Sequence, residues 1–247
     1  MSDRETLPVE LVCLDMAGTT VGDGGAVEEA FVEAIDAAGV GDGPERDEML
    51  RFVRDTMGTS KIEVFRSLFG DEGRARGANE SFERAYRRAV ASGRVAPLPG
   101  ASEAIAALRS TGCKVALTTG FSVTTRDEIL DELAWRDLVD LALCPEEAGR
   151  GRPYPDLVLA AVLRLGVGDV AAVAVVGDTA ADLECGRRAG ASVRAGVLTG
   201  ADDAGRLAAA GATHVLRSVG ELPELLAGPV LPGAEGLFAT RWRAVQR

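Results

Sequence analysis

Short apolar segments alternate with amphipathic segments along the chain from residue 98 onward, and one more apolar segment lies near the start. The apolar segments predict buried strands, and the apolar residues between them recur with the spacing of a helix. Strands that alternate with helices of this length indicate βαβ units and a parallel sheet. The predicted strands span residues 11–15, 115–118, 141–144, 173–176, 192–197 and 213–216. The predicted helices span residues 101–110, 125–133, 156–165, 181–189 and 202–210.

Residues 22–97 interrupt this alternation. They contain no segment with a strand pattern, but amphipathic stretches joined by glycine-rich connections, at residues 27–38, 46–55, 60–68 and 80–91. We therefore expect an α/β fold with a Rossmann-like parallel core, built from residues 1–21 and 98–247. Residues 22–97 are expected to form an inserted α-helical cap domain over the carboxyl edge of the sheet, with hinges at residues 22–25 and 97–100.

Composition narrows the classes of partner. The chain has 247 residues, of which 47% are hydrophobic, and its formal net charge of −11 argues against nucleic acid or an anionic membrane as partner. No apolar run is long enough to span a bilayer, and the first residues lack the apolar stretch of a signal peptide. The four cysteines are widely spaced, which favours buried thiols over disulfides or metal ligands. We expect a soluble, cytoplasmic protein.

Carboxylates follow two of the predicted strands. Asp15 ends the first strand, and Asp178 follows the strand at residues 173–176, with Asp182 one helical turn later. Ligands of open α/β sheets bind at the carboxyl ends of strands. Carboxylates gathered there repel one another unless a cation lies between them, and their hard oxygen atoms suit Mg²⁺. A single aspartate in such a place could equally cap a loop, but the second motif favours a metal site.

Two further motifs supply groups that bind phosphoryl oxygens. The strand at residues 115–118 ends in Thr118-Thr119-Gly120, whose hydroxyl groups can donate to a phosphoryl oxygen. Arg152, between Gly151 and Pro153, places a cation before a predicted helix. Its guanidinium fork matches a pair of phosphoryl oxygens and also screens carboxylates.

Taken together and in this order, the four motifs resemble the haloacid dehalogenase superfamily, whose members work through an aspartyl-phosphate intermediate. The resemblance covers nearly the whole chain and implies that Asp15 is the nucleophile. It also implies a Mg²⁺ site formed by Asp15, the backbone carbonyl of Ala17, Asp178 and, through bound water, Asp182. Catalytic roles then fall to Asp15, Lys61, Thr119 and Arg152, and substrate contacts to Ala17, Gly18, Thr19, Met57, Gly120 and Phe121.

Two substitutions narrow the resemblance to the phosphonoacetaldehyde hydrolase (phosphonatase) family and its phosphonatase-like relatives. Ala17 stands where most of the superfamily has an acidic residue that protonates the leaving group, and Arg152 stands where most have lysine. The phosphonatase family carries a lysine after Met-Gly in its cap, which forms a Schiff base with the substrate. Here the matching residue is Lys61, after Met57-Gly58, and Lys114 is the only other lysine in the chain.

The chemistry of C–P cleavage accounts for this combination. Breaking a C–P bond leaves a carbanion, which no nearby acid turns into a good leaving group. Converting the neighbouring carbonyl to a protonated imine provides an electron sink, so that an enamine leaves instead. A primary amine can form this imine and a guanidinium cannot. The alternative is that Lys61 is a solvated helix residue, and the scarcity of lysine in an arginine-rich chain favours the functional interpretation.

Two positions depart from the phosphonatase pattern. Val64 replaces the family's proton-relaying histidine, and Phe121 replaces its tyrosine. The only histidine, His214, lies late in the chain and is interpreted as structural. Water, Glu63 or the substrate itself must then carry the protons of imine formation, which leaves a hydroxylated relative of phosphonoacetaldehyde open as the substrate.

The sequence thus predicts a Mg²⁺-dependent hydrolase that cleaves the C–P bond of phosphonoacetaldehyde or a related 2-oxoalkylphosphonate. Two alternatives stay open: a phosphatase acting on a small phosphate monoester, with Lys61 only recognising charge, and a catalytically weak phosphate-binding protein. The expected partner is a small phosphonate or phosphate. By analogy with phosphonatase-like relatives, a homodimer would form through the cap helices.

Overall fold

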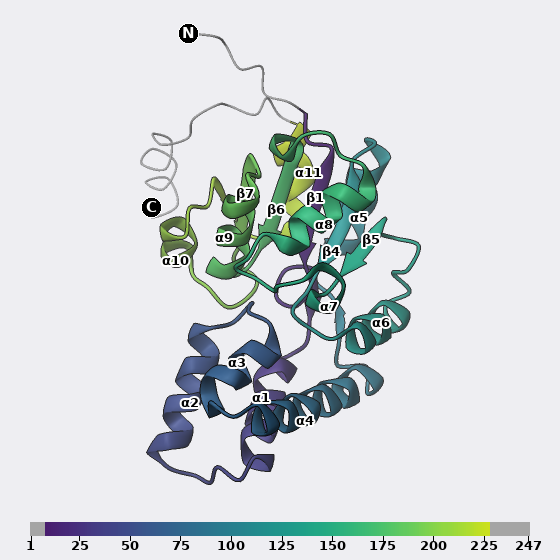
Figure 1. The fold of residues 1–247 in the computed structure, drawn as a ribbon. Helices are drawn as coiled ribbons and strands as arrows, with labels where there is room; N and C mark the ends of the chain where they lie inside the picture. The colour runs from purple at the N-terminus through teal and green to yellow at the C-terminus, as the bar shows by residue number, and fades with distance from the viewer. Residues whose placement is uncertain (1–7, 228–247) are drawn as a thin grey trace, which may run out of the picture.

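Six parallel strands form the main sheet of the computed structural model, which describes residues 8–227 of the chain (Figure 1). Their order in the sheet is β5-β4-β1-β6-β7-β8. The strands are β1 (Leu11–Asp15), β4 (Lys114–Thr118), β5 (Leu141–Leu143), β6 (Val173–Gly177), β7 (Val193–Val197) and β8 (His214–Leu216). This sheet and its helices confirm the predicted Rossmann-like α/β fold.

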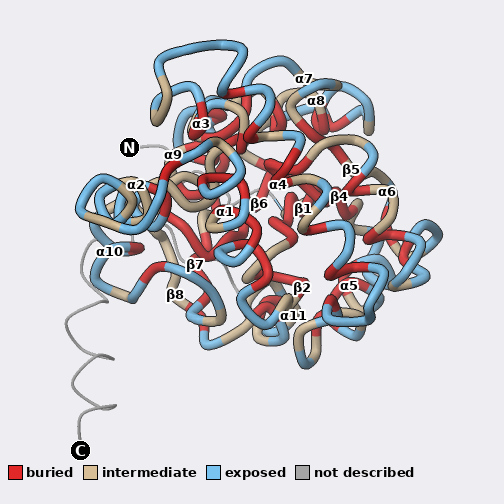
Figure 2. The backbone as a smooth tube through the Cα atoms, turned by 90° about the horizontal axis from the view of Figure 1, so that it is seen from below, coloured by how far each residue is buried: buried red, intermediate tan, exposed pale blue. Residues whose placement is uncertain are grey.

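Helices cover both faces of the sheet, which explains why its strands are apolar throughout rather than alternating. Along β1, Val12 and Leu14 pack into one core cluster with Ile105, whereas Leu11 and Cys13 pack into a second with Leu157. Figure 2 shows these strands as buried segments surrounded by exposed loops. The helices around the sheet are α5 (Ala101–Ser110), α6 (Val123–Glu132), α7 (Pro145–Ala148), α8 (Asp156–Leu165), α9 (Ala180–Ala189), α10 (Ala204–Ala209) and α11 (Leu222–Ala227), with 3-10 turns at Val170–Ala172 and Val219–Glu221.

Four helices lie below the sheet in Figure 1 and pack around a cluster of aromatic rings. They are α1 (Ala26–Ala37), α2 (Pro44–Asp55), α3 (Lys61–Phe69) and α4 (Glu72–Ala91). The ring centroid of Phe31 lies 5.2 Å from that of Phe65 and 4.7 Å from that of Phe82. Two short antiparallel strands, β2 (Val21–Gly22) and β3 (Ala96–Pro97), pair where the chain enters and leaves these helices.

Helix α4 is longer than the pattern predicts. It starts at Glu72 rather than at residue 80, because the Asp71 side chain caps it by accepting a hydrogen bond from the Arg74 backbone N–H at 2.8 Å. Gly73 and Gly77 lie inside the helix, although their sequence is typical of a loop. The strands β2 and β3 and the helices α7 and α11 were also missed, because such short elements leave no readable periodicity.

Neither bilayer-spanning helices nor disulfides occur in the described part of the chain. None of its helices combines the length and the hydrophobicity that crossing a membrane requires. All four cysteines are free, and Cys13, Cys144 and Cys185 are buried. Residues 1–7 and 228–247, which belong to the predicted core domain, lie outside the described residues.

Candidate active site

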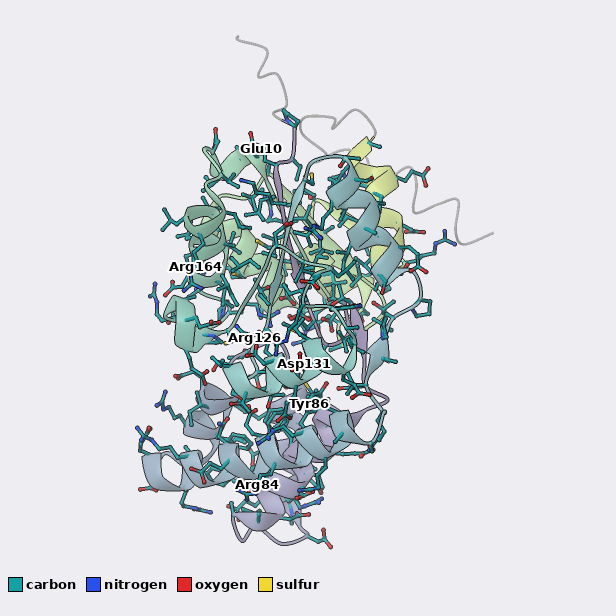
Figure 3. The ribbon with its side chains drawn as sticks, turned by 90° about the vertical axis from the view of Figure 1, so that its right-hand side faces the viewer. Glu10, Arg84, Tyr86, Arg126, Asp131 and Arg164 are labelled. Carbon is teal, nitrogen blue, oxygen red and sulfur yellow. The ribbon has the colours of Figure 1, made fainter. Side chains whose placement is uncertain are left out.

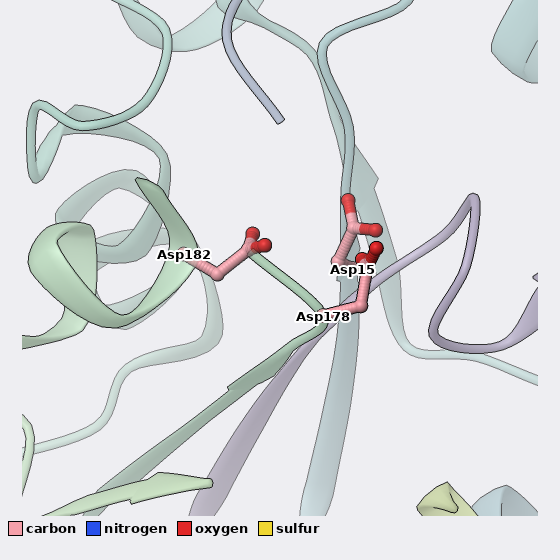
Figure 4. A group of neighbouring side chains, drawn as sticks. All are labelled: Asp15, Asp178 and Asp182. Atoms are coloured by element: carbon pink, nitrogen blue, oxygen red, sulfur yellow. The ribbon is translucent and has the colours of Figure 1, made fainter. Parts of the chain in front are cut away.

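The predicted carboxylates meet at the carboxyl edge of the sheet. Asp15 ends β1, Asp178 follows the neighbouring strand β6, and Asp182 lies in the first turn of α9. One carboxylate oxygen from each lies within 4.8 Å of the others, and all three side chains are buried. Figure 4 shows Asp15 and Asp178 side by side, with Asp182 reaching toward them from its helix.

A buried arginine completes this group. The Nη1 atom of Arg152 lies 2.6 Å from an Asp15 carboxylate oxygen and also pairs with Asp182. We call Asp15, Arg152, Asp178 and Asp182 the strand-end cluster. Burial alone would lower the pKa of Arg152, but the charges of Asp15 and Asp182 outweigh burial and raise it. The guanidinium is therefore permanently charged and balances one of the three carboxylates.

Among the described residues, only Arg152 forms salt bridges with these carboxylates, which leaves negative charge in the cluster. Burial raises the pKa of Asp15 well above its usual range, and the charges of Asp182 and Asp178 add to this effect against the opposing charge of Arg152. Burial and the charge of Asp182 raise the pKa of Asp178 to about 6. Three hard oxygen ligands that repel one another in a buried site fit a divalent cation such as Mg²⁺.

Local backbone geometry holds Asp178 and Asp182 in place. Asp178 accepts hydrogen bonds from the Thr19 hydroxyl at 3.1 Å and from the Ala201 backbone N–H at 2.8 Å. Asp182 accepts a hydrogen bond from the Thr179 hydroxyl at 2.5 Å. Thr179 is also the N-cap of α9 and forms a capping box with Asp182. Gly18 has a left-handed backbone (φ +87°), and a Cβ atom there would lie 2.5 Å from an Asp178 oxygen, so this position requires glycine.

The other residues predicted to bind the phosphoryl group lie in loops beside this cluster. Thr118 is in register with Asp15 in the neighbouring strand, so Thr119 and Gly120 continue to the same edge of the sheet. Thr119 is buried, and its hydroxyl accepts a hydrogen bond from the Phe121 backbone N–H at 3.2 Å, which leaves the hydroxyl proton free to donate. Ala17 lies two residues beyond Asp15 and is partly buried.

Lys61 is the first residue of α3 and is only 7% exposed. Its Nζ atom lies 5.1 Å from the ring centroid of Phe121 and 6.0 Å from that of Phe82. No carboxylate of the described residues forms a salt bridge with it. Burial lowers the pKa of Lys61, and Arg152 lowers it further, against the opposing charges of Asp15 and Glu83. The amine is thus pushed toward its neutral, nucleophilic form.

The loop before Lys61 lies directly against the core. A Cβ atom added at Gly58 would lie 2.2 Å from the Thr179 hydroxyl oxygen, and one at Gly151 would lie 2.8 Å from the Ser60 Cβ atom. A Cβ atom at Gly120 would lie 3.0 Å from the Thr59 carbonyl oxygen. Glycines on both sides of the contact, Gly58 in the loop and Gly120 and Gly151 opposite it, therefore allow this close approach. Met57, predicted to contact substrate, is half-buried and packs against the larger core cluster.

The proton carriers considered from sequence do not all reach the site. Glu63 is exposed (55%) and its carboxylate lies 2.5 Å from the Arg66 guanidinium, so it is engaged at the surface. His214 lies in β8, where its Nδ1 atom is 3.0 Å from the Thr213 hydroxyl. The side chains of Val64 and Phe121 are buried and carry no exchangeable proton.

Tyr86 of α4 is a buried residue with a polar group that the sequence did not single out. Its ring lies 4.4 Å from that of Phe121 between centroids, and its hydroxyl has no hydrogen-bond partner. The sequence signal was weak, because Tyr86 follows Phe82 by one helical turn and fits the apolar face of its helix. Figure 3 labels Tyr86 where α4 faces the core.

Most of the chain is similar to known proteins. A family model for haloacid dehalogenase-like hydrolases matches residues 9–190. A Bordetella pertussis protein named phosphonoacetaldehyde hydrolase is 33% identical over 263 residues, covering 90% of this chain and 93% of that protein. A Bacillus cereus protein of the same name is 31% identical over 216 residues, covering 81% and 79%. The solved structure of a phosphonoacetaldehyde hydrolase-like protein from Oleispira antarctica has a TM-score of 0.77 at 27% identity, covering 90% and 92%.

Proposed function

The chain belongs to the haloacid dehalogenase-like hydrolases, as its motifs predicted, and we propose that it cleaves the C–P bond of phosphonoacetaldehyde or a closely related 2-oxoalkylphosphonate. The single observation that carries this proposal is the buried, unpaired Lys61 amine that faces aromatic rings beside the strand-end cluster. Ala17 supports it, because a site without a general acid suits a carbon leaving group better than an alkoxide. The names of the relatives agree with it.

The strand-end cluster would bind and transfer the phosphoryl group. Asp15 would attack phosphorus, while Arg152, Thr119 and Gly120 hold the phosphoryl oxygens. Mg²⁺ would be held by Asp15, the carbonyl of Ala17, Asp178 and, through water, Asp182; when bound, it neutralises charge on the carboxylates and the phosphoryl group. Arg152 then has two functions, since it pairs with Asp15 and Asp182 before the substrate enters.

Lys61 would prepare the carbon side of the bond. Its neutral amine condenses with the substrate carbonyl to an imine and water, and a proton taken from solvent converts the imine to an iminium ion. When Asp15 attacks phosphorus, the electron pair of the C–P bond moves into the iminium, which gives an enamine and an aspartyl-phosphate. Water hydrolyses the aspartyl-phosphate to inorganic phosphate. Protonation and hydrolysis of the enamine adduct release the aldehyde or ketone and restore Lys61.

Residues 22–97 would act as a cap domain over the core formed by residues 1–21 and 98–247. The close contacts of Gly58 with Thr179 and of Gly151 with Ser60 correspond to a closed cap in this proposal. Closure excludes water and brings Lys61 to a substrate bound at the sheet edge. Gly18, Thr19, Met57 and Phe121 would shape the enclosed pocket.

A substrate panel tests the proposal. Inorganic phosphate release is measured with Mg²⁺ for phosphonoacetaldehyde, longer 2-oxoalkylphosphonates, a 2-oxoalkylphosphonate with a hydroxyl group, and small alkyl phosphates. We expect turnover of an oxoalkylphosphonate and, with borohydride, a covalent adduct on Lys61. Faster turnover of alkyl phosphates without an adduct would replace the proposal with a phosphatase. Binding of phosphate without turnover of any compound would indicate a binding protein.

A further inference from the structure

The unsatisfied hydroxyl of Tyr86 points to a function for this residue. Tyr86 is fully buried, with its ring stacked near Phe82 (centroids 6.2 Å apart) and Phe121 (4.4 Å). Among the described side chains, only its hydroxyl and the Nε atom of Arg152 are buried without a hydrogen-bond partner. A buried hydroxyl without a partner destabilises the folded protein, so such groups are rare unless a ligand satisfies them.

The carboxylates around Tyr86 accept hydrogen bonds from other groups. Asp23 accepts hydrogen bonds from the backbone N–H groups of Gly25 and Val27, at 2.9 and 3.2 Å. Glu83 accepts from the hydroxyl of Ser122 at 2.6 Å and also from that of Thr125.

The surroundings of Tyr86 keep its hydroxyl protonated. Burial raises the pKa of Tyr86 well above its usual value, and Asp23 raises it further through its charge and as a hydrogen-bond acceptor, as do the charges of Asp15 and Glu83. The hydroxyl is therefore protonated and, although Asp23 lies near it, no described acceptor meets it with the geometry of a full hydrogen bond.

Tyr86 shares its surroundings with the amine of Lys61. Both side chains lie against the rings of Phe82 and Phe121, and the charges of Asp15 and Glu83 act on both. We call Phe82, Tyr86 and Phe121, together with Lys61, the aromatic wall. Within it, Tyr86 provides the only hydroxyl group.

Imine formation requires a proton carrier. Attack of the amine on a carbonyl gives a zwitterion with an ammonium nitrogen and an alkoxide oxygen. A group that both donates and accepts a proton must then transfer one proton from nitrogen to oxygen. Val64 and Phe121 cannot do so, Glu63 is paired at the surface, and His214 lies in β8. The stacking of Tyr86 on Phe121 places a phenol beside the ring over which the Lys61 amine lies.

We propose that Tyr86 donates a hydrogen bond to the substrate carbonyl oxygen and carries the proton from nitrogen to oxygen during imine formation; this rests on the proposed function. Attack by Lys61 forms the N–C bond and moves the carbonyl π pair onto oxygen. That oxygen takes the phenol proton, and the tyrosinate takes a proton from the new ammonium nitrogen. The products are the neutral carbinolamine and the restored phenol. Tyr86 is then a catalytic residue supplied by α4.

Borohydride trapping with and without the hydroxyl tests this role. The full chain with Mg²⁺ and an oxoalkylphosphonate is quenched with borohydride at successive times, and the Lys61 adduct is measured by mass spectrometry. We expect Tyr86→Phe to slow adduct formation about 10²-fold, the usual contribution of a general acid–base group. Tyr154→Phe is the matched control, because it removes the same atom from the only other tyrosine, which is 43% exposed. Phe121→Tyr added to Tyr86→Phe should recover at least about 10-fold, since it returns a phenol to the same wall.

Thermal unfolding separates this role from a structural one. Removing an unpartnered hydroxyl should leave the Tm of Tyr86→Phe unchanged or slightly raised. If instead the hydroxyl bonds Asp23 in solution, Tyr86→Phe and Asp23→Asn will lower the Tm alike and adduct will form at the wild-type rate, which overturns the proposal. Slow trapping with a lowered Tm and no recovery by Phe121→Tyr also overturns it. An absent adduct in the wild type overturns the proposed function itself, whereas an adduct formed equally fast by wild type and Tyr86→Phe overturns only the role of Tyr86.

Discussion

The strand-end cluster and the aromatic wall bury charge in opposite ways. Asp15 and its neighbours exchange hydrogen bonds and ion pairs among themselves, while the Lys61 amine forms no salt bridge with a described residue and lies over the rings of Phe82 and Phe121. Burial raises the pKa of Asp15 and lowers that of Lys61, so it favours the neutral form of both. A neutral amine is the form that attacks a carbonyl, but a neutral carboxylic acid is a poor nucleophile. This difference supports the proposal that an added cation completes one half of the site, whereas burial, together with the charge of Arg152, prepares the other half.

The first prediction concerns the half for which we propose a cation. EDTA should abolish phosphate release and Mg²⁺ should restore it, because the carboxylates of the strand-end cluster are not balanced by Arg152 alone. Asp15→Ala should lower kcat at least about 10⁴-fold, as expected for loss of a covalent nucleophile. Its Tm should be retained, because Asp182 still pairs with Arg152. Full turnover in metal-free protein would contradict the assignment of this cluster.

The second prediction concerns the half prepared by burial. Lys61→Arg keeps the positive charge but cannot form an imine, so C–P cleavage should fall at least about 10³-fold. Lys114→Arg is the matched control, because Lys114 is the only other lysine and donates to the Leu165 carbonyl at the opposite end of β4. Near-normal phosphate release by Lys61→Arg would show that Lys61 only recognises charge.

The third prediction adds a general acid beside the strand-end cluster. Ala17→Asp introduces a carboxyl group where the superfamily places its general acid, two residues after Asp15. Hydrolysis of small alkyl phosphates should rise about 10²-fold, the lower range for general acid catalysis, while C–P cleavage gains nothing. The ratio of kcat/KM for the two substrate classes measures the change. An unchanged ratio would mean that the missing acid is not what separates the two reactions.

The two halves also differ in how much of them the sequence predicted. Asp15, Asp178 and Asp182 follow apolar strands, and parallel strands bring their carboxyl ends to one edge, so local pattern was sufficient to place these residues together. The predicted strands of the main sheet differ from the observed ones by at most one residue at either end, because a buried parallel strand is a continuous apolar run.

The aromatic wall could not be predicted in this way. Tyr86 lies in a helix of the insert and Phe121 in a loop of the core, and their stacking depends on how α4 packs against α6 rather than on spacing along the chain. The same holds for Glu83, whose carboxylate binds the hydroxyl of Ser122 at the start of α6. Hydrophobic periodicity identifies a buried helix face, but it does not say which hydroxyl on that face lacks a partner.

The fourth prediction tests the contact that joins the two halves. Gly151→Ala places a Cβ atom 2.8 Å from the Ser60 Cβ atom, at a backbone conformation that alanine adopts without strain. Overpacking of this kind costs about 1–3 kcal/mol, so we expect kcat/KM to fall about 10-fold. Gly168→Ala is the control, because it has the same freedom from backbone strain and nothing within 4 Å. Equal activity of the two variants would mean that the loop at residues 57–60 does not approach the core during turnover.

The fifth and smallest effect is expected at the rim, where α4 meets α6. The Nε atom of Arg87 lies 2.8 Å from a Glu128 carboxylate oxygen, and both side chains are exposed. Because exposed ion pairs contribute little, Arg87→Ala should change kcat/KM less than about fivefold and leave the salt dependence of activity almost unchanged. Arg206→Ala makes the parallel test on α10, where the guanidinium donates to the Asp55 carbonyl at 3.1 Å. A fall in kcat/KM at either position larger than that of Gly151→Ala would show that these exposed pairs hold residues 22–97 against the rest of the chain. The close packing of Ser60 and Gly151 would then follow from closure rather than produce it.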